Sequence, residues 1–152
     1  MSTAQSARRL VIGIDPGLTT GFAVYSRQER KLIRVESTDF WGAIERVKDY
    51  ARNEVKVIVE VAHHAPTFRH LKAEGQNVHT LSKIARNIGH VTREAQLLVE
   101  GLRRLGYEVV EAKPLGKAKK AEDDRRQFER LTGWTERTSQ HGRDAARLAY
   151  GV

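Results

Sequence analysis

Acidic and imidazole side chains occur in this chain where a metal site could form. Asp15 ends an apolar run that begins at Leu10, and Glu60 ends a second strand-like run. His141 and Asp144 lie close together near the C-terminus. A carboxylate at the end of a buried strand is costly to bury unless a cation or another partner neutralises it. Several such placements in one small basic chain indicate a metal site that acts on phosphate.

Each of these residues also has an ordinary structural interpretation. Asp15 precedes a Pro-Gly pair and fits a turn in which its carboxylate bonds its own backbone. Glu60 fits a strand end in water, His141 fits a helix cap, and Asp144 fits a surface ion pair with an arginine of the same helix. Their joint occurrence, in this order and on these types of element, favours the metal site.

The expected elements predict the fold class. We expect strands at 10–15, 22–26, 31–36, 55–61 and 107–111, and helices at 40–51, 80–105, 117–131 and 140–150. Three strands in a meander, then alternating helices and strands, predict an α/β fold with a mixed five-stranded sheet flanked by helices, the ribonuclease-H-like arrangement. We expect a flexible N-terminal tail over residues 1–9 and a single domain over residues 10–152.

Two helix boundaries have specific signals. Asp39 is a typical N-cap for a helix whose apolar positions recur at helical spacing through Ala51. Gly106 follows the long helix and is expected to stop it.

The predicted elements would bring the polar residues together. Paired strands lie about 4.8 Å apart, so carboxylates on one face of two neighbours can share a metal. We therefore expect the strands of Asp15 and Glu60 to be neighbours. His141 and Asp144 are three positions apart, which places both on one face of a helix. They lie in its first turn, where backbone N–H groups also favour a bound phosphate.

Composition narrows the partners. The chain of 152 residues has a formal net charge of +8 and a pI near 10.0, which favours an anionic partner, most simply nucleic acid. It has no cysteine, which excludes disulfides and cysteine-zinc sites. No apolar run is long enough for a membrane span, and the N-terminus lacks the apolar region of a secretory signal, so we expect a cytoplasmic protein.

The motifs resemble those of a known family. Residues 13–17 read GIDPG and residues 20–24 read TGFAV, while residues 58–60 read IVE and residues 141–149 read HGRDAARLA. These segments, in this order, resemble the signature of the RuvC-type Holliday-junction resolvases. The short chain fits a compact phage-type member, in a bacterial cell or a phage-infected host.

The resemblance implies a ribonuclease-H-like nuclease that acts as a homodimer and makes paired nicks in four-way DNA junctions. Carried onto matching positions, it makes Asp15, Glu60, His141 and Asp144 the catalytic residues and metal ligands, with two Mg²⁺ or Mn²⁺ ions per active site. The chain departs from many members in having His141 where they have a carboxylate. Three carboxylates suit Mg²⁺ or Mn²⁺, and the imidazole nitrogen tilts the site toward Mn²⁺.

Two segments are candidates for DNA contact. The expected DNA-binding residues are Lys113, Lys117, Lys119 and Lys120 in the first segment, and His63, His64, Phe68 and Arg69 in the second. The helix after the lysines alternates basic and acidic residues, so it also fits a solvated, ion-paired helix. The histidines of the second segment also fit a three-histidine zinc site.

The long helix carries an apolar stripe that is a candidate dimer seam. Its expected interface residues are Leu81, Ile84, Ile88, Gly89 and Val91. The alternative is that the stripe packs on the sheet, which fits its C-terminal half in any case. A two-fold dimer is the simplest arrangement for two symmetric cuts.

Two other functional classes remain open from the sequence. One is a catalytically silent nucleic-acid-binding module of the same fold. The other is an ATPase domain, because residues 15–21 also resemble the phosphate turn of actin- and hexokinase-like proteins. Such ATPases are usually far larger, which disfavours that interpretation.

Overall fold

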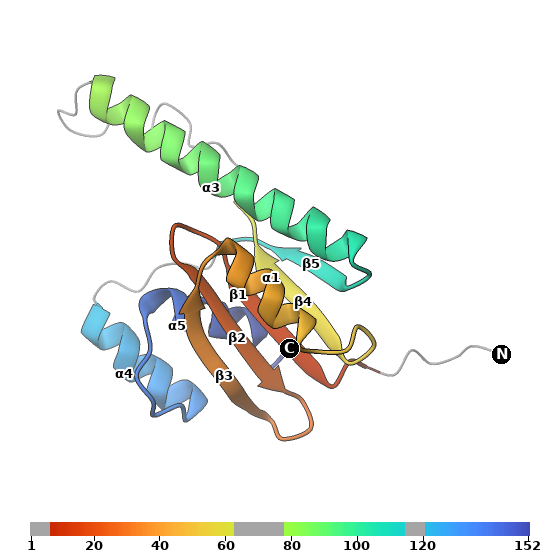
Figure 1. Cartoon of the computed structure of the whole chain (residues 1–152). Helices are drawn as coiled ribbons and strands as arrows, with labels where there is room; N and C mark the ends of the chain where they lie inside the picture. Colours follow the sequence, from red (N-terminus) through yellow and green to blue (C-terminus); the bar gives the residue numbers. More distant parts are fainter. Residues whose placement is uncertain (1–6, 63–77, 115–120) are drawn as a thin grey trace.

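The computed structural model describes residues 7–62, 78–114 and 121–152 (Figure 1). The strands are β1 (Leu10–Asp15), β2 (Thr20–Ser26), β3 (Lys31–Thr38), β4 (Val55–Glu60) and β5 (Glu108–Ala112). The helices of the described part are α1 (Phe40–Lys48), α3 (Val78–Arg104), α4 (Ala121–Thr132) and α5 (Gln140–Ala149). Within these ranges, no helix is both long and apolar enough to cross a membrane.

The strands form one mixed sheet in the order β3-β2-β1-β4-β5. The first three strands pair antiparallel along the chain, and β4 pairs parallel with both β1 and β5. This confirms the predicted mixed five-stranded sheet, with β1 at its centre. The central place of β1 explains why its apolar run is continuous, since a strand covered on both faces needs apolar residues on both sides.

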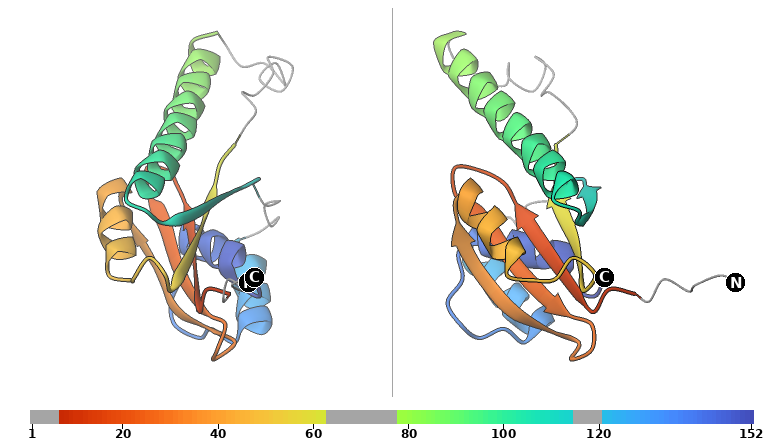
Figure 2. Two further views of the ribbon diagram at one scale, coloured as in Figure 1. Left: turned by 90° about the vertical axis from the view of Figure 1, so that its right-hand side faces the viewer. Right: turned by 45° about the vertical axis from the view of Figure 1, so that its right-hand side comes forward.

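Helices cover both faces of the sheet (Figure 2). On one face, Ile12 and Ile14 of β1 pack in a core that includes residues of α1 and α3. On the other face, Val11 belongs to a core with Phe128 of α4 and Ala145 of α5. The alternation along β1 therefore decides which helices each side chain meets.

α3 packs on the sheet through its C-terminal half. Its buried residues Ala95, Leu98, Val99 and Leu102 all lie in the C-terminal half, as the core-packing interpretation expected. The N-terminal half projects beyond the sheet (Figure 1). The helix ends before Gly106, whose φ of +89° is a conformation that glycine adopts without strain, so the predicted stop signal is confirmed.

Other boundaries moved by a few residues. The N-cap is confirmed, because the Asp39 carboxylate accepts a hydrogen bond of 2.6 Å from the Gly42 N–H. Extending that helix to Ala51 was wrong, since α1 ends at Lys48 and the chain turns, with Tyr50 N–H donating to the Val47 carbonyl at 3.0 Å. β2 begins earlier and β3 ends later than predicted, because their pairing continues to Thr20 opposite Thr38.

Candidate active site

Asp15 and Glu60 end neighbouring strands at the same edge of the sheet. β1 and β4 are parallel, with Ile14 opposite Val59, so the next residue of each strand is Asp15 or Glu60. Side chains alternate along a strand, which places Asp15 and Glu60 on the face of the second core, with Val11 and Ile58. The predicted adjacency of these two strands is confirmed.

α5 brings His141 and Asp144 to that edge. Ser139 caps this helix, and its hydroxyl accepts a hydrogen bond of 3.0 Å from the Gly142 N–H. In the first turn, His141 Nδ1 lies 3.2 Å from Asp15 Oδ2. The Asp15 side chain is only 12% exposed and the His141 side chain is 47% exposed, so the pair joins a covered carboxylate to an imidazole at the surface.

The cap of α5 bears on the expectation that backbone N–H groups of its first turn would bind phosphate. Gly142 N–H donates to the Ser139 hydroxyl, and Arg143 N–H donates to the Ser139 carbonyl at 3.1 Å. These two N–H groups of the first turn are therefore used within the protein. A phosphate at this helix end would rely on the side chains rather than on these donors.

Two glycines in the strands allow α5 to lie this close. A Cβ built on Gly13 would be 2.0 Å from the Ala145 carbonyl oxygen, and one on Gly21 would be 1.8 Å from the His141 carbonyl oxygen. Any larger residue would push the helix away from the sheet. These positions were not among the predicted determinants of the site, although a glycine inside a strand pattern signals close backbone approach.

Asp144 belongs to an ion network as well as to the cleft. Arg147 Nη1 lies 3.2 Å from Asp144 Oδ1, and Arg147 Nη2 lies 2.5 Å from Asp124 Oδ1. Arg143 Nε lies 2.7 Å from the other Asp124 oxygen. Asp144 is thus the partner of an arginine on its own helix, as the alternative interpretation expected, and it also lines the cleft.

Asp124 is the buried centre of this network. Its residue is 4% exposed and Arg143 is 5% exposed. Burial disfavours the charged form of Asp124, but hydrogen bonds from Arg143 and Arg147 outweigh burial and lower the pKa of this carboxyl. The network connects α4 to α5. It was not predicted from the sequence.

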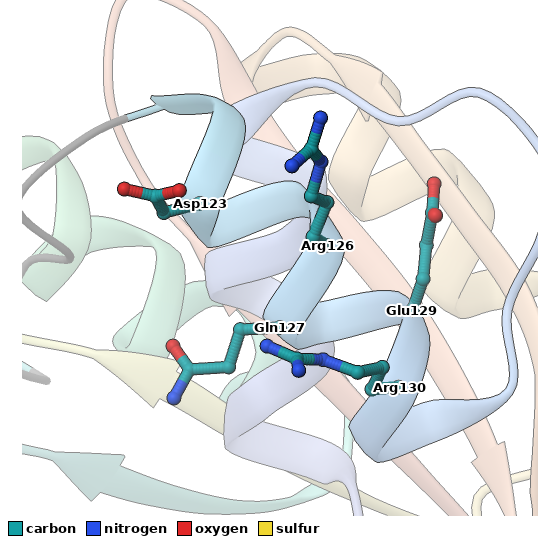
Figure 3. Close-up of a pocket in the computed structure, with 5 residues that line it drawn as sticks. All are labelled: Asp123, Arg126, Gln127, Glu129 and Arg130. Carbon is teal, nitrogen blue, oxygen red and sulfur yellow. The ribbon is translucent and has the colours of Figure 1, made fainter.

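The four predicted residues share one cleft of about 610 Å³. Asp15, Glu60, His141 and Asp144 all line it, together with the 16–19 turn, Val91 and Pro114. Strand ends, a turn, the start of α5 and the side of α3 thus form its walls. A second hollow, of about 660 Å³, lies on α4 (Figure 3), and its lining residues are Asp123, Arg126, Gln127, Glu129 and Arg130.

The four side chains are of the right chemical types to bind a divalent cation, but their spacing is not that of a formed metal site. Three carboxylates and an imidazole are appropriate ligands for Mg²⁺ or Mn²⁺. Asp15 and His141 are in contact, and Glu60 and Asp144 line the same cleft. Across residues 7–62, 78–114 and 121–152, however, no group of three such side chains forms a ready metal site. A complete ligand shell would need these side chains to draw closer together.

Comparison with solved structures finds a distant likeness. No protein-family model matches the chain, and a search of curated proteins finds no match. The fold is similar to that of the Fowlpox virus resolvase in its crystal structure with substrate Holliday junction DNA, with a TM-score of 0.45 and 16% sequence identity. The similar region covers 92% of this chain and 93% of that chain.

Most of the predicted DNA-binding residues lie outside the described residues. These are His63, His64, Phe68, Arg69, Lys117, Lys119 and Lys120. Lys113 is described and exposed, next to Pro114 at the cleft. On α4, Arg125 forms an ion pair of 2.8 Å with Glu129, as the ion-paired interpretation of this helix expects.

The predicted dimer seam is described only in part. The backbone of Leu81, Ile84 and Ile88 is in α3, but their side chains lie outside the described part. Gly89 is exposed, and a Cβ added there would meet nothing within 4 Å. Val91 is half-buried and lines the cleft, so it contributes to the candidate active site.

Proposed function

We propose that the chain is a structure-selective DNA endonuclease that resolves four-way (Holliday) junctions by metal-dependent phosphodiester hydrolysis. One observation carries this proposal. Four side chains from distant parts of the sequence line one cleft, namely Asp15, Glu60, His141 and Asp144. The segments that form this site are the ones that resemble the RuvC-type signature. The net charge of +8 supports an anionic polymer as substrate.

The contact between Asp15 and His141 suggests how the imidazole works. An ionised carboxylate only accepts hydrogen bonds, so at 3.2 Å His141 Nδ1 must be the donor. Nε2 is then the acceptor of the neutral ring, available to a cation or a proton. Asp15 would thus orient His141, as carboxylates commonly orient metal-binding histidines.

The cleft would hold two Mg²⁺ or Mn²⁺ ions on Asp15, Glu60, His141 and Asp144. Bound divalent ions supply positive charge beside the scissile phosphate. The carboxylates of the cleft in turn need such a charge to accept a polyanion, because they otherwise repel it. Arg147 already offsets part of the charge of Asp144, at 3.2 Å.

A cleavage assay on labelled DNA tests the proposed function. A four-way junction is incubated with Mg²⁺, Mn²⁺ or EDTA, beside linear duplex, an RNA–DNA hybrid and ATP. We expect paired nicks in the junction with either metal and none in EDTA. Junction binding without cutting would indicate a silent module, and ATP hydrolysis would indicate an ATPase.

A further inference from the structure

Leu18 is an apolar side chain held out into solvent. It is 97% exposed, the largest exposure among the large hydrophobic residues that the structure describes. Single exposed leucines are common on protein surfaces, but this one lines the cleft together with Asp15, Glu60 and His141. Its position therefore distinguishes it from Leu131, which is 56% exposed on α4 and is not among the residues that line this cleft.

The turn holds Leu18 close to Asp15. Asp15 pairs with Gly21 at the ends of β1 and β2, so residues 16–20 must reverse the chain within a short span. Pro16 restricts the backbone there, and the Thr20 hydroxyl donates to the Gly17 carbonyl at 3.4 Å. Three residues span at most about 11 Å. The Cα of Leu18 therefore lies within that distance of the Cα of Asp15, and its side chain can contact groups near the candidate active site.

The chemistry of DNA limits what an apolar side chain can contact there. Beside a scissile phosphate, an intact duplex presents charged phosphates and polar sugars. A branch point can instead present the face of an unstacked base, against which a leucine can bury its apolar surface. Leucine is among the side chains that proteins insert between base steps.

We propose that Leu18 packs against an unstacked base at the branch point, beside the phosphate that is cut. This inference rests on the proposed function and adds to it a residue that discriminates branched DNA from duplex. Because the Leu18 side chain is almost fully exposed, its replacement should leave the fold intact.

The test compares Leu18→Ala with Leu131→Ala, the same change at an exposed site away from the cleft. The probe is a four-way junction with 2-aminopurine at the branch point, in EDTA, beside a matched linear duplex. We expect wild type and Leu131→Ala to raise the 2-aminopurine fluorescence and Leu18→Ala to raise it much less. Junction affinity of Leu18→Ala should fall about tenfold, which is about 1.4 kcal/mol, with duplex affinity unchanged.

Three results would overturn the inference while leaving the proposed function intact. The first is a fluorescence response of Leu18→Ala equal to that of wild type. The second is an equal loss of affinity of Leu18→Ala for junction and duplex. The third is a change in the sedimentation of free Leu18→Ala with a fluorescence response equal to that of wild type. The last would mean that Leu18 contacts a second copy of the chain. Wild-type protein that fails to cut the junction in Mg²⁺ or Mn²⁺ would overturn the proposed function and this inference together.

Discussion

At the scale of single residues, the contact between Asp15 and His141 organises the candidate active site. Asp15 comes from the central strand and His141 from the last helix, and their side chains meet at 3.2 Å. A carboxylate this well covered normally needs a hydrogen-bond donor or a cation as its partner. Both an oriented imidazole and a bound cation would meet that need.

Asp15→Asn should abolish cleavage and leave junction binding nearly unchanged. The amide has the shape of the carboxylate but lacks its charge, while most of the affinity for DNA comes from lysine and arginine contacts with phosphates. Cleavage and gel-shift assays on one preparation measure both effects. Asp123→Asn, the same change at an exposed position of α4, is the control and should cut normally. Metal-dependent cutting by Asp15→Asn at the wild-type rate would remove Asp15 from the site.

At the scale of elements, α5 is the part on which the site depends most. It touches the sheet at Gly13 and Gly21 through its backbone and is tied to α4 through Asp124. Arg143 and Arg147 both bind this carboxylate, but only Arg147 also contacts Asp144. The two arginines therefore offer a matched pair of variants.

Arg147→Lys should impair metal binding more than Arg143→Lys does. Lysine keeps the charge but cannot bridge two carboxylates as the guanidinium does, so Asp144 would lose its fixed orientation. Loss of such an outer contact typically weakens metal affinity about 10- to 100-fold. Calorimetric titration with Mn²⁺ and urea unfolding, on both variants, separate site effects from stability. Equal metal affinities at equal stability would show that Arg147 has only a structural role.

The Asp124 network should make stability depend on acid. The pKa of Asp124 is lower in the folded chain than its ordinary value of 3.8, so folding favours its charged form. This contribution is complete above the ordinary value and is lost as the pH falls through the lowered folded pKa. Asp124→Asn should cost about 3–5 kcal/mol at neutral pH, because it leaves the buried Arg143 and the half-buried Arg147 without their charged partner.

Urea unfolding at several pH values tests this prediction. The stability difference between wild type and Asp124→Asn should shrink as the pH is lowered below about 3.8. Asp123→Asn, the neighbouring exposed aspartate, should show little change at any pH. A difference between wild type and Asp124→Asn that stays constant down to low pH would contradict the assigned ionisation.

At the scale of the whole molecule, α3 is the element that extends beyond the sheet. Its C-terminal half packs on the sheet, whereas its N-terminal half projects beyond it (Figure 1). The open surface at Gly89 would allow another helix to approach closely. The predicted homodimer, with two clefts for two cuts, would use this half of the helix.

Ile88→Glu should shift the protein toward monomer and abolish paired nicking. A charge placed in an apolar contact between helices is strongly unfavourable when it has no partner. Asn87→Glu makes the same change of charge at an exposed neighbour and is the control. Sedimentation of the free protein and of its junction complex measures assembly. A wild-type chain that is monomeric in both states would contradict the dimer.

The sequence by itself determined the local features of this protein. Largely apolar runs rich in valine and isoleucine predict β1 and β4, because strands covered on both faces need apolar residues on both sides. Asp39 and Gly106 mark helix ends because capping depends on residues within a turn. Asp15 and Glu60 could be singled out because each ends a strand, and His141 and Asp144 because they are three positions apart on one helix.

Only the tertiary structure decided how these parts meet. The partners of Asp124, the approach of α5 to Gly13 and Gly21, and the exposure of Leu18 depend on contacts between residues far apart in the chain. A strand glycine can mark a close approach, but no local pattern names the partner in such contacts, because the partner follows from the strand order and from the packing of helices on the sheet. The distance between Asp15 and His141 is a property of that packing, since it joins the first strand to the last helix.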